Sequence, residues 1–247
     1  MKAAASAQLR LLDLQAEDTA IAQLEHRRRS LPEHAALAEA RTVRGRLGQS
    51  LVGVRTRVAD LQLDVEKAES DLVPVRERLA RDQQRVDAGT VTDPKQLNAI
   101  LEEINHLGRR ISDLEDIELE VMERLEIATG EQEMLASELT EVENAMRALI
   151  ASRDEQTAQL DADQAAHQAV RDAIAAELPA DLLALYDRIR VRAGGLGAAA
   201  LKGRRCSGCQ IEATTIALAG YAAAAPDEVL RCEECERVLV RTGAVEA

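Results

Sequence analysis

The sequence has almost no aromatic side chains. Its 247 residues include no Phe, no Trp and only two Tyr. Aromatic residues usually supply a large share of the area buried in a globular core, so their scarcity argues against one compact globule of this length. Apolar residues nevertheless make up 46% of the chain and charged residues 30%, and the apolar ones are mostly Ala, Leu, Val and Ile. This composition is typical of long helices and coiled coils.

Glycine, proline and long apolar runs are also scarce. The 13 Gly and 5 Pro exclude a collagen-like chain. No segment approaches the roughly 20 apolar residues that cross a membrane. The first residues run into Arg10 and Asp13 without the apolar stretch of a signal peptide. We therefore expect a cytoplasmic protein that does not interact with membranes.

The formal net charge of −13 is unevenly distributed along the chain. Residues 1–178 carry 22 basic and 35 acidic side chains, whereas residues 179–247 carry nine of each. Because like charges repel over long distances, the first part disfavours contact with nucleic acid, while the second part does not.

Two apolar seams predict two long helices. One runs from Leu47 to Val86 and the other from Leu97 to Leu149, both in alternating steps of three and four residues. Between them, Gly89 suits a helix end, and Pro94 suits the first position of the next helix. Short connections join antiparallel neighbours. The pattern therefore predicts a hairpin whose tip lies near residues 88–94.

Proline and the end of the seam define the remaining boundaries. Pro32 predicts a break near residues 30–32, with Ser30 capping the helix that restarts there. Pro74 predicts either a kink or a locally relaxed helix. We expect Leu9, Leu12, Ile21 and Leu24 to pack along the hairpin, so residues 1–178 form one coiled-coil domain. Pro179 ends it, and residues 179–247 form a second domain.

All four cysteines lie in the last 42 residues, in two closely spaced pairs: Cys206 and Cys209, then Cys232 and Cys235. Two intervening residues let both thiolates of a pair reach one ion, and two such knuckles complete a tetrahedron of sulfurs. Because every coordination position is then filled, the motif indicates structural Zn²⁺ and argues against hydrolytic catalysis. Four-thiolate iron is the main competing metal. Strand-like stretches follow the knuckles at residues 211–216 and 238–240.

Basic residues gather around the first knuckle, with no acid from Arg188 to Ile211. They are Arg188, Arg190, Arg192, Lys202, Arg204 and Arg205. One interpretation is a surface that binds the phosphates of RNA or DNA. The other is electrostatic compensation, because four thiolates around Zn²⁺ leave a charge of about −2. The lack of aromatic stacking platforms opposes the first. The run Gly194–Gly197 is interpreted as a flexible linker.

These features together resemble the bacterial C4-type zinc-ribbon proteins with a long coiled-coil hairpin. Residues 91–97 resemble the family's hairpin tip, residues 114–123 its acidic helix signature, and residues 237–240 the ribbon strand after the second knuckle. The resemblance covers nearly the whole chain. It implies a mainly α fold, in which a long antiparallel coiled-coil hairpin carries a small four-cysteine zinc ribbon of short β-hairpins. Glu236 departs from it, because the family usually has Gly there, and a side chain strains that turn.

The resemblance brings no catalytic residues, and family members are generally regarded as adaptors. We therefore expect a non-enzymatic adaptor that binds protein through the coiled coil and the ribbon, with RNA or DNA at the ribbon as a further partner. One alternative is a thiol redox protein, although the thioredoxin-like βαβ context is missing. Another is a passive spacer that self-associates. Because an intramolecular hairpin satisfies one seam per helix, we expect a monomer.

Overall fold

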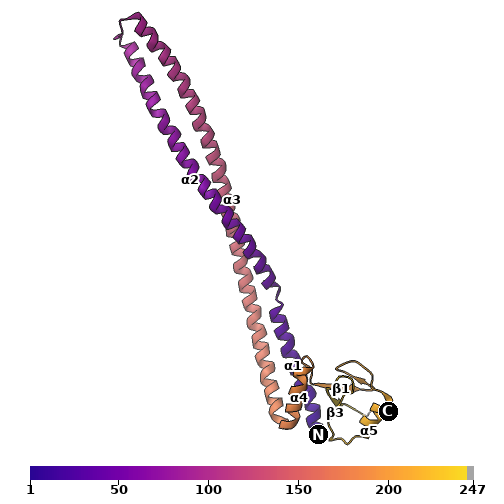
Figure 1. Ribbon diagram of the computed structural model, residues 1–247. Coiled ribbons are helices and arrows are strands. Elements are labelled where there is room, and N and C mark those ends of the chain that lie inside the picture. The colour runs from indigo at the N-terminus through magenta and orange to yellow at the C-terminus, as the bar shows by residue number, and fades with distance from the viewer. Residues whose placement is uncertain (244–247) are drawn as a thin grey trace. The chain divides into compact units, whose positions relative to one another are not determined.

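The computed structural model describes residues 1–243 and is mainly helical (Figure 1). Its helices are α1 (Ala5–Arg29), α2 (Pro32–Asp87), α3 (Pro94–Glu177), α4 (Ala180–Arg192) and α5 (Thr215–Ala223). Its strands are β1 (Ala198–Lys202), β2 (Arg205–Cys206), β3 (Leu230–Arg231) and β4 (Val238–Arg241). The long helices α2 and α3 form a hairpin, and the small strand-containing region carries the cysteines. The predicted fold class is thereby confirmed.

The chain divides into two compact units. The head unit combines the first 35 residues with the chain from Ile150 onward, and the tip unit comprises Ala36–Leu149. The domain boundary expected at residue 178 falls inside the head unit and stays a prediction. No helix of the described residues has the length and apolar character needed to cross a membrane.

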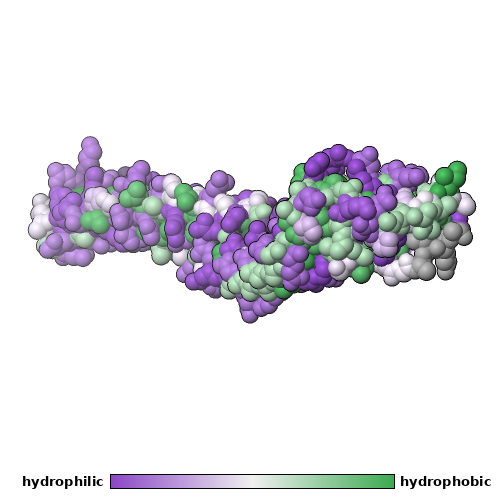
Figure 2. Space-filling model, turned by 90° about the horizontal axis from the view of Figure 1, so that it is seen from below, coloured by the Kyte–Doolittle hydropathy of each residue, from purple (hydrophilic) through white to green (hydrophobic). Residues whose placement is uncertain are grey.

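The tip unit is held together by the predicted seam. Val54, Val58 and Leu61 of α2 are buried with Ala128 of α3, and further aliphatic side chains of α3 pack against them. Hydrophilic residues cover most of the helical surface in the face seen in Figure 2. At the turn, Gly89 has a φ of 61°, and the side chain of Asp93 accepts a hydrogen bond from the amide of Lys95 at 3.1 Å. These interactions end one helix and start the next.

Ion pairs join the two arms of the tip unit, and in each of them an arginine of α2 meets a glutamate of α3. They are Arg44–Glu143 at 2.8 Å, Arg57–Glu131 at 2.8 Å, Arg76–Glu115 at 2.6 Å and Arg78–Glu103 at 2.9 Å. All are solvent-exposed, so each contributes only tenths of a kcal/mol. Their repeated pattern favours one register of the two arms.

The helix break near residue 30 is present, but Ser30 caps the end of α1 and not the start of α2. Its hydroxyl donates to the carbonyl of His26 at 2.8 Å and so closes α1. It does not cap α2, which starts at Pro32. Pro74 lies inside α2, which continues through it. The helix is therefore not broken at Pro74, and the choice between a kink and a locally relaxed helix stays a prediction.

The head unit contains a four-stranded sheet with the order β2-β1-β4-β3. The central strands β1 and β4 run parallel, and each edge strand pairs antiparallel with its neighbour. The strand predicted at residues 238–240 is confirmed. The one predicted at 211–216 is wrong, because α5 starts at Thr215. The hydroxyl of Thr214 accepts a hydrogen bond from the amide of Ala217 at 3.1 Å, and this cap outweighs the β propensity of the segment.

The N-terminal helix α1 belongs to the head unit and lies against its sheet. Leu11 and Leu14 are fully buried in a cluster with Val238 and Val240 of β4, whereas Leu9 is exposed. Before the helix, the amide of Ala3 donates to the carbonyl of Asp227 at 2.7 Å. The head core is therefore assembled from the two ends of the described chain.

The glycine run after α4 is a pinned turn and not a flexible linker. The side chain of Gln15 donates to the carbonyl of Gly195 at 3.0 Å and accepts from the amide of Gly197 at 2.7 Å. A Cβ atom at Gly197 would lie 2.7 Å from the carbonyl oxygen of Tyr186. Only glycine allows β1 to approach α4 so closely.

Candidate metal centre

The two cysteine knuckles have the same backbone conformation and the same pattern of backbone hydrogen bonds. The amide of Cys206 donates to the carbonyl of Ile211, and that of Cys232 donates to the carbonyl of Arg237, at 3.1 and 3.0 Å. The residue after each second cysteine has a left-handed backbone, with φ of 60° at Gln210 and 58° at Glu236. One knuckle starts at the last residue of β2, and the other connects β3 to β4. The central β1–β4 pair therefore brings the two turns together.

The four sulfur atoms lie within 4.8 Å of one another. Cys206 is 3.9 Å from Cys235, and Cys209 is 3.9 Å from Cys232, measured between sulfurs. A tetrahedral Zn²⁺ with bonds of about 2.3 Å needs sulfur separations of about 3.8 Å. The donors therefore fit a closed four-thiolate site, and each knuckle faces the other across a common centre.

The environment of the sulfurs favours different protonation states. Burial raises the pKa of the Cys206 and Cys232 thiols, that of Cys232 to about 12. Burial also acts against ionisation of Cys235, but hydrogen bonds from the backbone and side chain of Arg237 outweigh it and lower the pKa of Cys235 to about 7. Since a metal binds thiolates, its binding must release protons from the buried pair.

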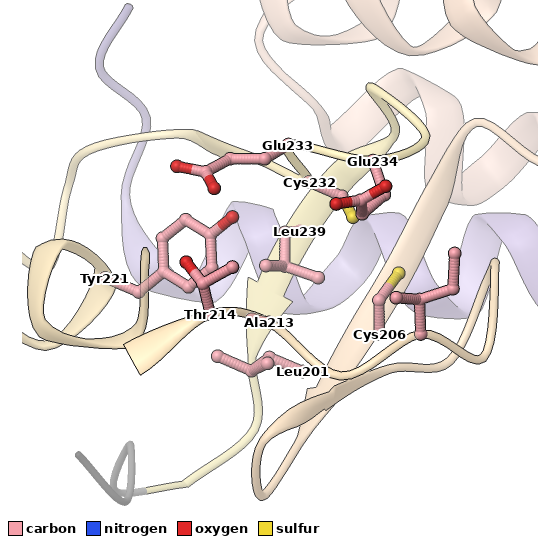
Figure 3. Close-up of a pocket in the computed structure, with 10 residues that line it drawn as sticks. Leu201, Cys206, Ala213, Thr214, Tyr221, Cys232, Glu233, Glu234 and Leu239 are labelled. Atoms are coloured by element: carbon pink, nitrogen blue, oxygen red, sulfur yellow. The ribbon is translucent and has the colours of Figure 1, made fainter. Parts of the chain in front are cut away.

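The sulfurs have a largely apolar setting. Cys206 and Cys232 are buried in a cluster with Leu201, Leu218 and Leu239. A recess beside them is lined by several of these side chains, with Glu233 and Glu234 of the second knuckle bordering it (Figure 3). The hydroxyl of Tyr221 donates to the carbonyl of Arg231 at 3.2 Å. This shell covers Cys206 and Cys232, whereas Cys209 and Cys235 are half-buried.

The six basic residues of the predicted phosphate surface do not form a single patch. Three lie on α4, where Arg190 pairs with Asp18 at 3.3 Å and Arg192 pairs with Glu236 at 2.7 Å. The other three surround the tight β1–β2 turn and line one hollow: Lys202, Arg204 and Arg205. Arg205 pairs with Glu212 at 3.3 Å. Among the described residues, Arg188, Lys202 and Arg204 form no ion pair.

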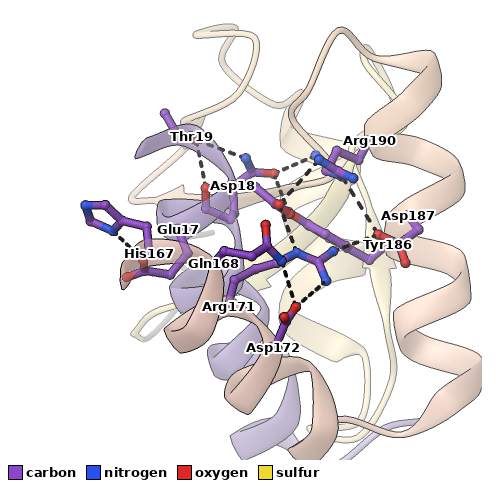
Figure 4. A network of polar contacts seen from close by, with 12 residues as sticks. Glu17, Asp18, Thr19, His167, Gln168, Arg171, Asp172, Tyr186, Asp187 and Arg190 are labelled. Atoms are coloured by element: carbon purple, nitrogen blue, oxygen red, sulfur yellow. Dashed lines mark hydrogen bonds and ion pairs between the residues drawn. The ribbon is translucent and has the colours of Figure 1, made fainter. Parts of the chain in front are cut away.

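A buried polar network near the sheet was not foreseen from the sequence (Figure 4). Its centre is Asp18 of α1, whose side chain is only 4% exposed. The carboxylate accepts from the hydroxyl of Tyr186 at 2.6 Å, from Arg171 of α3 at 3.1 Å and from Arg190 of α4 at 3.3 Å. Burial raises the pKa of Tyr186, so its hydroxyl remains a donor. The network joins three helices.

The spacing of residues in α1 contains a sequence signal for this network, because Asp18 lies on the same helix face as buried leucines. Leu11 and Leu14 are buried, and Asp18 follows at the next step of four. A carboxylate at a seam position must find partners, because an unpaired buried charge is very costly. The partners come from α3 and α4, far away in the chain, so the sequence alone does not identify them.

The helical part of the chain matches a known protein family. The model of the CT398-like coiled coil hairpin domain matches residues 14–194. The chain belongs to this family. The CT398-like family confirms the coiled-coil hairpin part of the resemblance, and the convergence of the four cysteines agrees with the remainder.

Similar members of the CT398-like family occur in mycobacteria. An uncharacterized protein of Mycobacterium tuberculosis is 36% identical over 241 residues, which cover 98% of either chain. A solved structure from Mycobacterium smegmatis is 34% identical, with a TM-score of 0.83 over 98% of this chain and all of the other. CT398 of Chlamydia trachomatis is 17% identical, with a TM-score of 0.65 over 96% and 98% of the two chains. This last likeness concerns the fold alone.

The left-handed backbone at Glu236 leads to a stability prediction. A residue other than glycine pays roughly 1 kcal/mol for this conformation. The carboxylate compensates only weakly through its exposed pairs with Arg192 at 2.7 Å and Arg231 at 3.4 Å. We expect Glu236→Gly to stabilise the head unit by about 0.5 kcal/mol in thermal unfolding followed by the tyrosine signal. Glu236→Ala removes the same pairs but keeps the strain, so it should destabilise. A glycine variant no more stable than the alanine variant would contradict the prediction.

Proposed function

We propose that this protein is a non-enzymatic adaptor. In this proposal its helical hairpin binds a protein partner, and its head unit contacts nucleic-acid phosphates. The observation that carries the second part is the β1–β2 turn, where Lys202 and Arg204 stand beside Arg205 in one hollow without an ion pair among the described residues. Basic side chains that are not neutralised by the protein are available to phosphate oxygens.

We assign structural Zn²⁺ to Cys206, Cys209, Cys232 and Cys235. The ion supplies the link between the two knuckles and fixes the β1–β2 turn relative to β4. Its four positions are filled by sulfur, so it offers no place for a substrate or an activated water. The side chain of Arg237 is hydrogen-bonded to the carbonyls of Leu196 and Ala193 at 2.9 and 3.0 Å. It thus holds a positive charge near the four thiolates, which favours their ionised state.

The test is nucleic-acid binding by the full chain, measured by fluorescence anisotropy with a labelled single-stranded RNA, a single-stranded DNA and a DNA duplex at several salt concentrations. We expect Lys202→Glu with Arg204→Glu to weaken binding at least tenfold. Losing two phosphate contacts should also lower the salt slope for a single strand by about 1.4.

The matched control makes the same charge change in the tip unit, with Arg46→Glu and Arg55→Glu on the exposed surface of α2. We expect this control to retain binding. If both double variants lose affinity equally, the binding reflects overall charge and the assignment to the β1–β2 turn is wrong. Affinity that neither double variant changes would also refute it.

A further inference from the structure

The outer surface of α3 in the tip unit carries an unusual combination of exposed apolar and acidic side chains. Leu119, Met122, Ile127 and Met134 are 58%, 47%, 72% and 56% exposed. Single exposed apolar residues are ordinary on a protein surface. These four, however, fall within 16 residues of one helix. Their common location requires an explanation beyond chance exposure.

The helical repeat places these side chains away from the partner helix. The seam of α3 uses Leu114, Val121 and Ala128, of which Leu114 and Ala128 are buried. At 3.6 residues per turn, Leu119 points almost opposite Ala128, and Met122, Ile127 and Met134 lie within a quarter turn of Leu119. The apolar stripe therefore lies on the side that the hairpin leaves uncovered.

Acidic residues are interspersed with the apolar residues of the stripe. Residues 113–143 contain 12 acidic side chains and a single basic one, Arg124. Three of these acids, Glu115, Glu131 and Glu143, pair with arginines of α2. Glu123, Glu126 and Glu133 are exposed, and the helical repeat places them on the same outer side as the stripe. We call these three acids and the four apolar residues the acidic-apolar face.

We propose that the acidic-apolar face binds a basic amphipathic helix of a partner protein. The apolar stripe spans 15 helical steps, about 22 Å, which matches a partner helix of about four turns. Apolar side chains of the partner would cover the stripe. Its Lys and Arg side chains would pair with the acids that lie between the apolar residues of this face. This inference rests on the proposed adaptor role and defines the chemistry of the protein partner.

Charge complementarity selects this occupant over others. A second copy that presented the same face would bring the acids of both chains together, which is destabilising. A copy that presented another surface would make a heterologous contact, and such contacts produce open assemblies unless the rotation closes. Nucleic acid and anionic lipid are repelled by 12 acids in 31 residues.

The test uses a fluorescent 18-residue helical peptide with Leu at heptad seam positions and Lys or Arg at the flanking positions. Binding to the full chain is measured by anisotropy. A scrambled peptide of the same composition keeps the charge but loses the apolar face. We expect the amphipathic peptide to bind at least tenfold more tightly than the scrambled one. Both Leu119→Ser with Met122→Ser and Glu123→Lys with Glu126→Lys should weaken binding at least fivefold.

The control is Val52→Ser with Leu63→Ser, which removes comparably exposed apolar side chains from α2 and should leave affinity unchanged. Equal binding of both peptides, or equal loss in the control, would overturn the inference. Sedimentation of the chain alone provides another test, because a dimer abolished by Leu119→Ser with Met122→Ser would assign the face to self-association. Far-UV circular dichroism verifies that each variant keeps its helices. Peptide failure with intact nucleic-acid binding would refute this inference but not the role proposed for the head unit.

Discussion

Removal of the metal is expected to unfold the sheet region of the head unit and to leave the helices of the tip unit in place. The apolar cluster around the sulfurs is small, and in such domains a structural zinc site supplies on the order of 10 kcal/mol. The tyrosine signal and the helical signal can be followed separately. Both tyrosines lie in the head unit, whereas most helical residues lie in α2 and α3. A strong chelator should therefore remove the contribution of Tyr221, which packs in the cluster around the sulfurs, from the near-ultraviolet tyrosine signal, while most of the far-ultraviolet helical signal persists.

The zinc assignment can be tested by elemental analysis of the purified protein and of cysteine variants. We expect one zinc per chain in the purified protein and loss of that metal in Cys206→Ser with Cys232→Ser. Glu234→Gln is the matched control, since it changes an exposed residue of the second knuckle without touching a sulfur. It should keep both metal and tyrosine signal. A cysteine variant that retains the native tyrosine signal, or a purified protein without bound metal, would contradict the zinc assignment.

The sequence allowed accurate prediction of features that depend on neighbouring residues. The seams of α2 and α3 repeat over many turns, and the turn between them combines a glycine, a capping aspartate and a proline in the required order. Cysteine spacing likewise indicates which thiols converge, because two C-x-x-C turns have few other ways to satisfy a metal. In these cases the chemical reason for the structure lies within a few residues of the feature itself.

The features that sequence reasoning missed depend on contacts between distant segments. The packing of α1 on the sheet follows from Leu11 and Leu14 meeting β4, more than 200 residues away in the chain. The incorrect strand at 211–216 shows a related limit, because a single side-chain cap at Thr214 decided between helix and strand. The pinned glycine turn depends in the same way on Gln15, a residue of a different helix.

The separation of the six basic residues into paired and unpaired ones also depends on contacts between distant segments. From the sequence, Arg190 and Arg204 belong to one positively charged stretch. In the structure, Arg190 neutralises Asp18 of α1, and Arg204 remains at the β1–β2 turn. A charge run is thus available to a ligand only after the internal ion pairs are known. Among the described residues this requirement leaves Arg188, Lys202 and Arg204, and of these Lys202 and Arg204 are the stronger candidates for phosphate contact because they line one hollow.

The network around Asp18 leads to the second large expected effect. Replacing Asp18 by alanine leaves the guanidinium groups of Arg171 and Arg190 without their shared carboxylate, and it leaves the hydroxyl of Tyr186 with one acceptor fewer. Removing one partner of a buried ion pair typically costs about 3–5 kcal/mol. Asp187 still lies 3.4 Å from Arg171 and 3.8 Å from Arg190 after the substitution, so part of the positive charge stays compensated. We therefore expect Asp18→Ala to destabilise the head unit by about 3 kcal/mol, the lower end of that range, in denaturant unfolding followed by tyrosine fluorescence.

Asp172 provides a control within the same network. Its carboxylate lies 3.7 Å from Arg171 but is well exposed to solvent, so Asp172→Ala should cost less than about 0.5 kcal/mol. The contrast between the two variants separates burial from charge, since both remove one carboxylate near the same arginine. Equal and small losses would mean that Arg171 and Arg190 reach water once Asp18 is removed. In that case the three helices would be held together mainly by the apolar contacts of Leu11, Leu14 and Leu182, and the polar network would contribute little to the stability of the head unit.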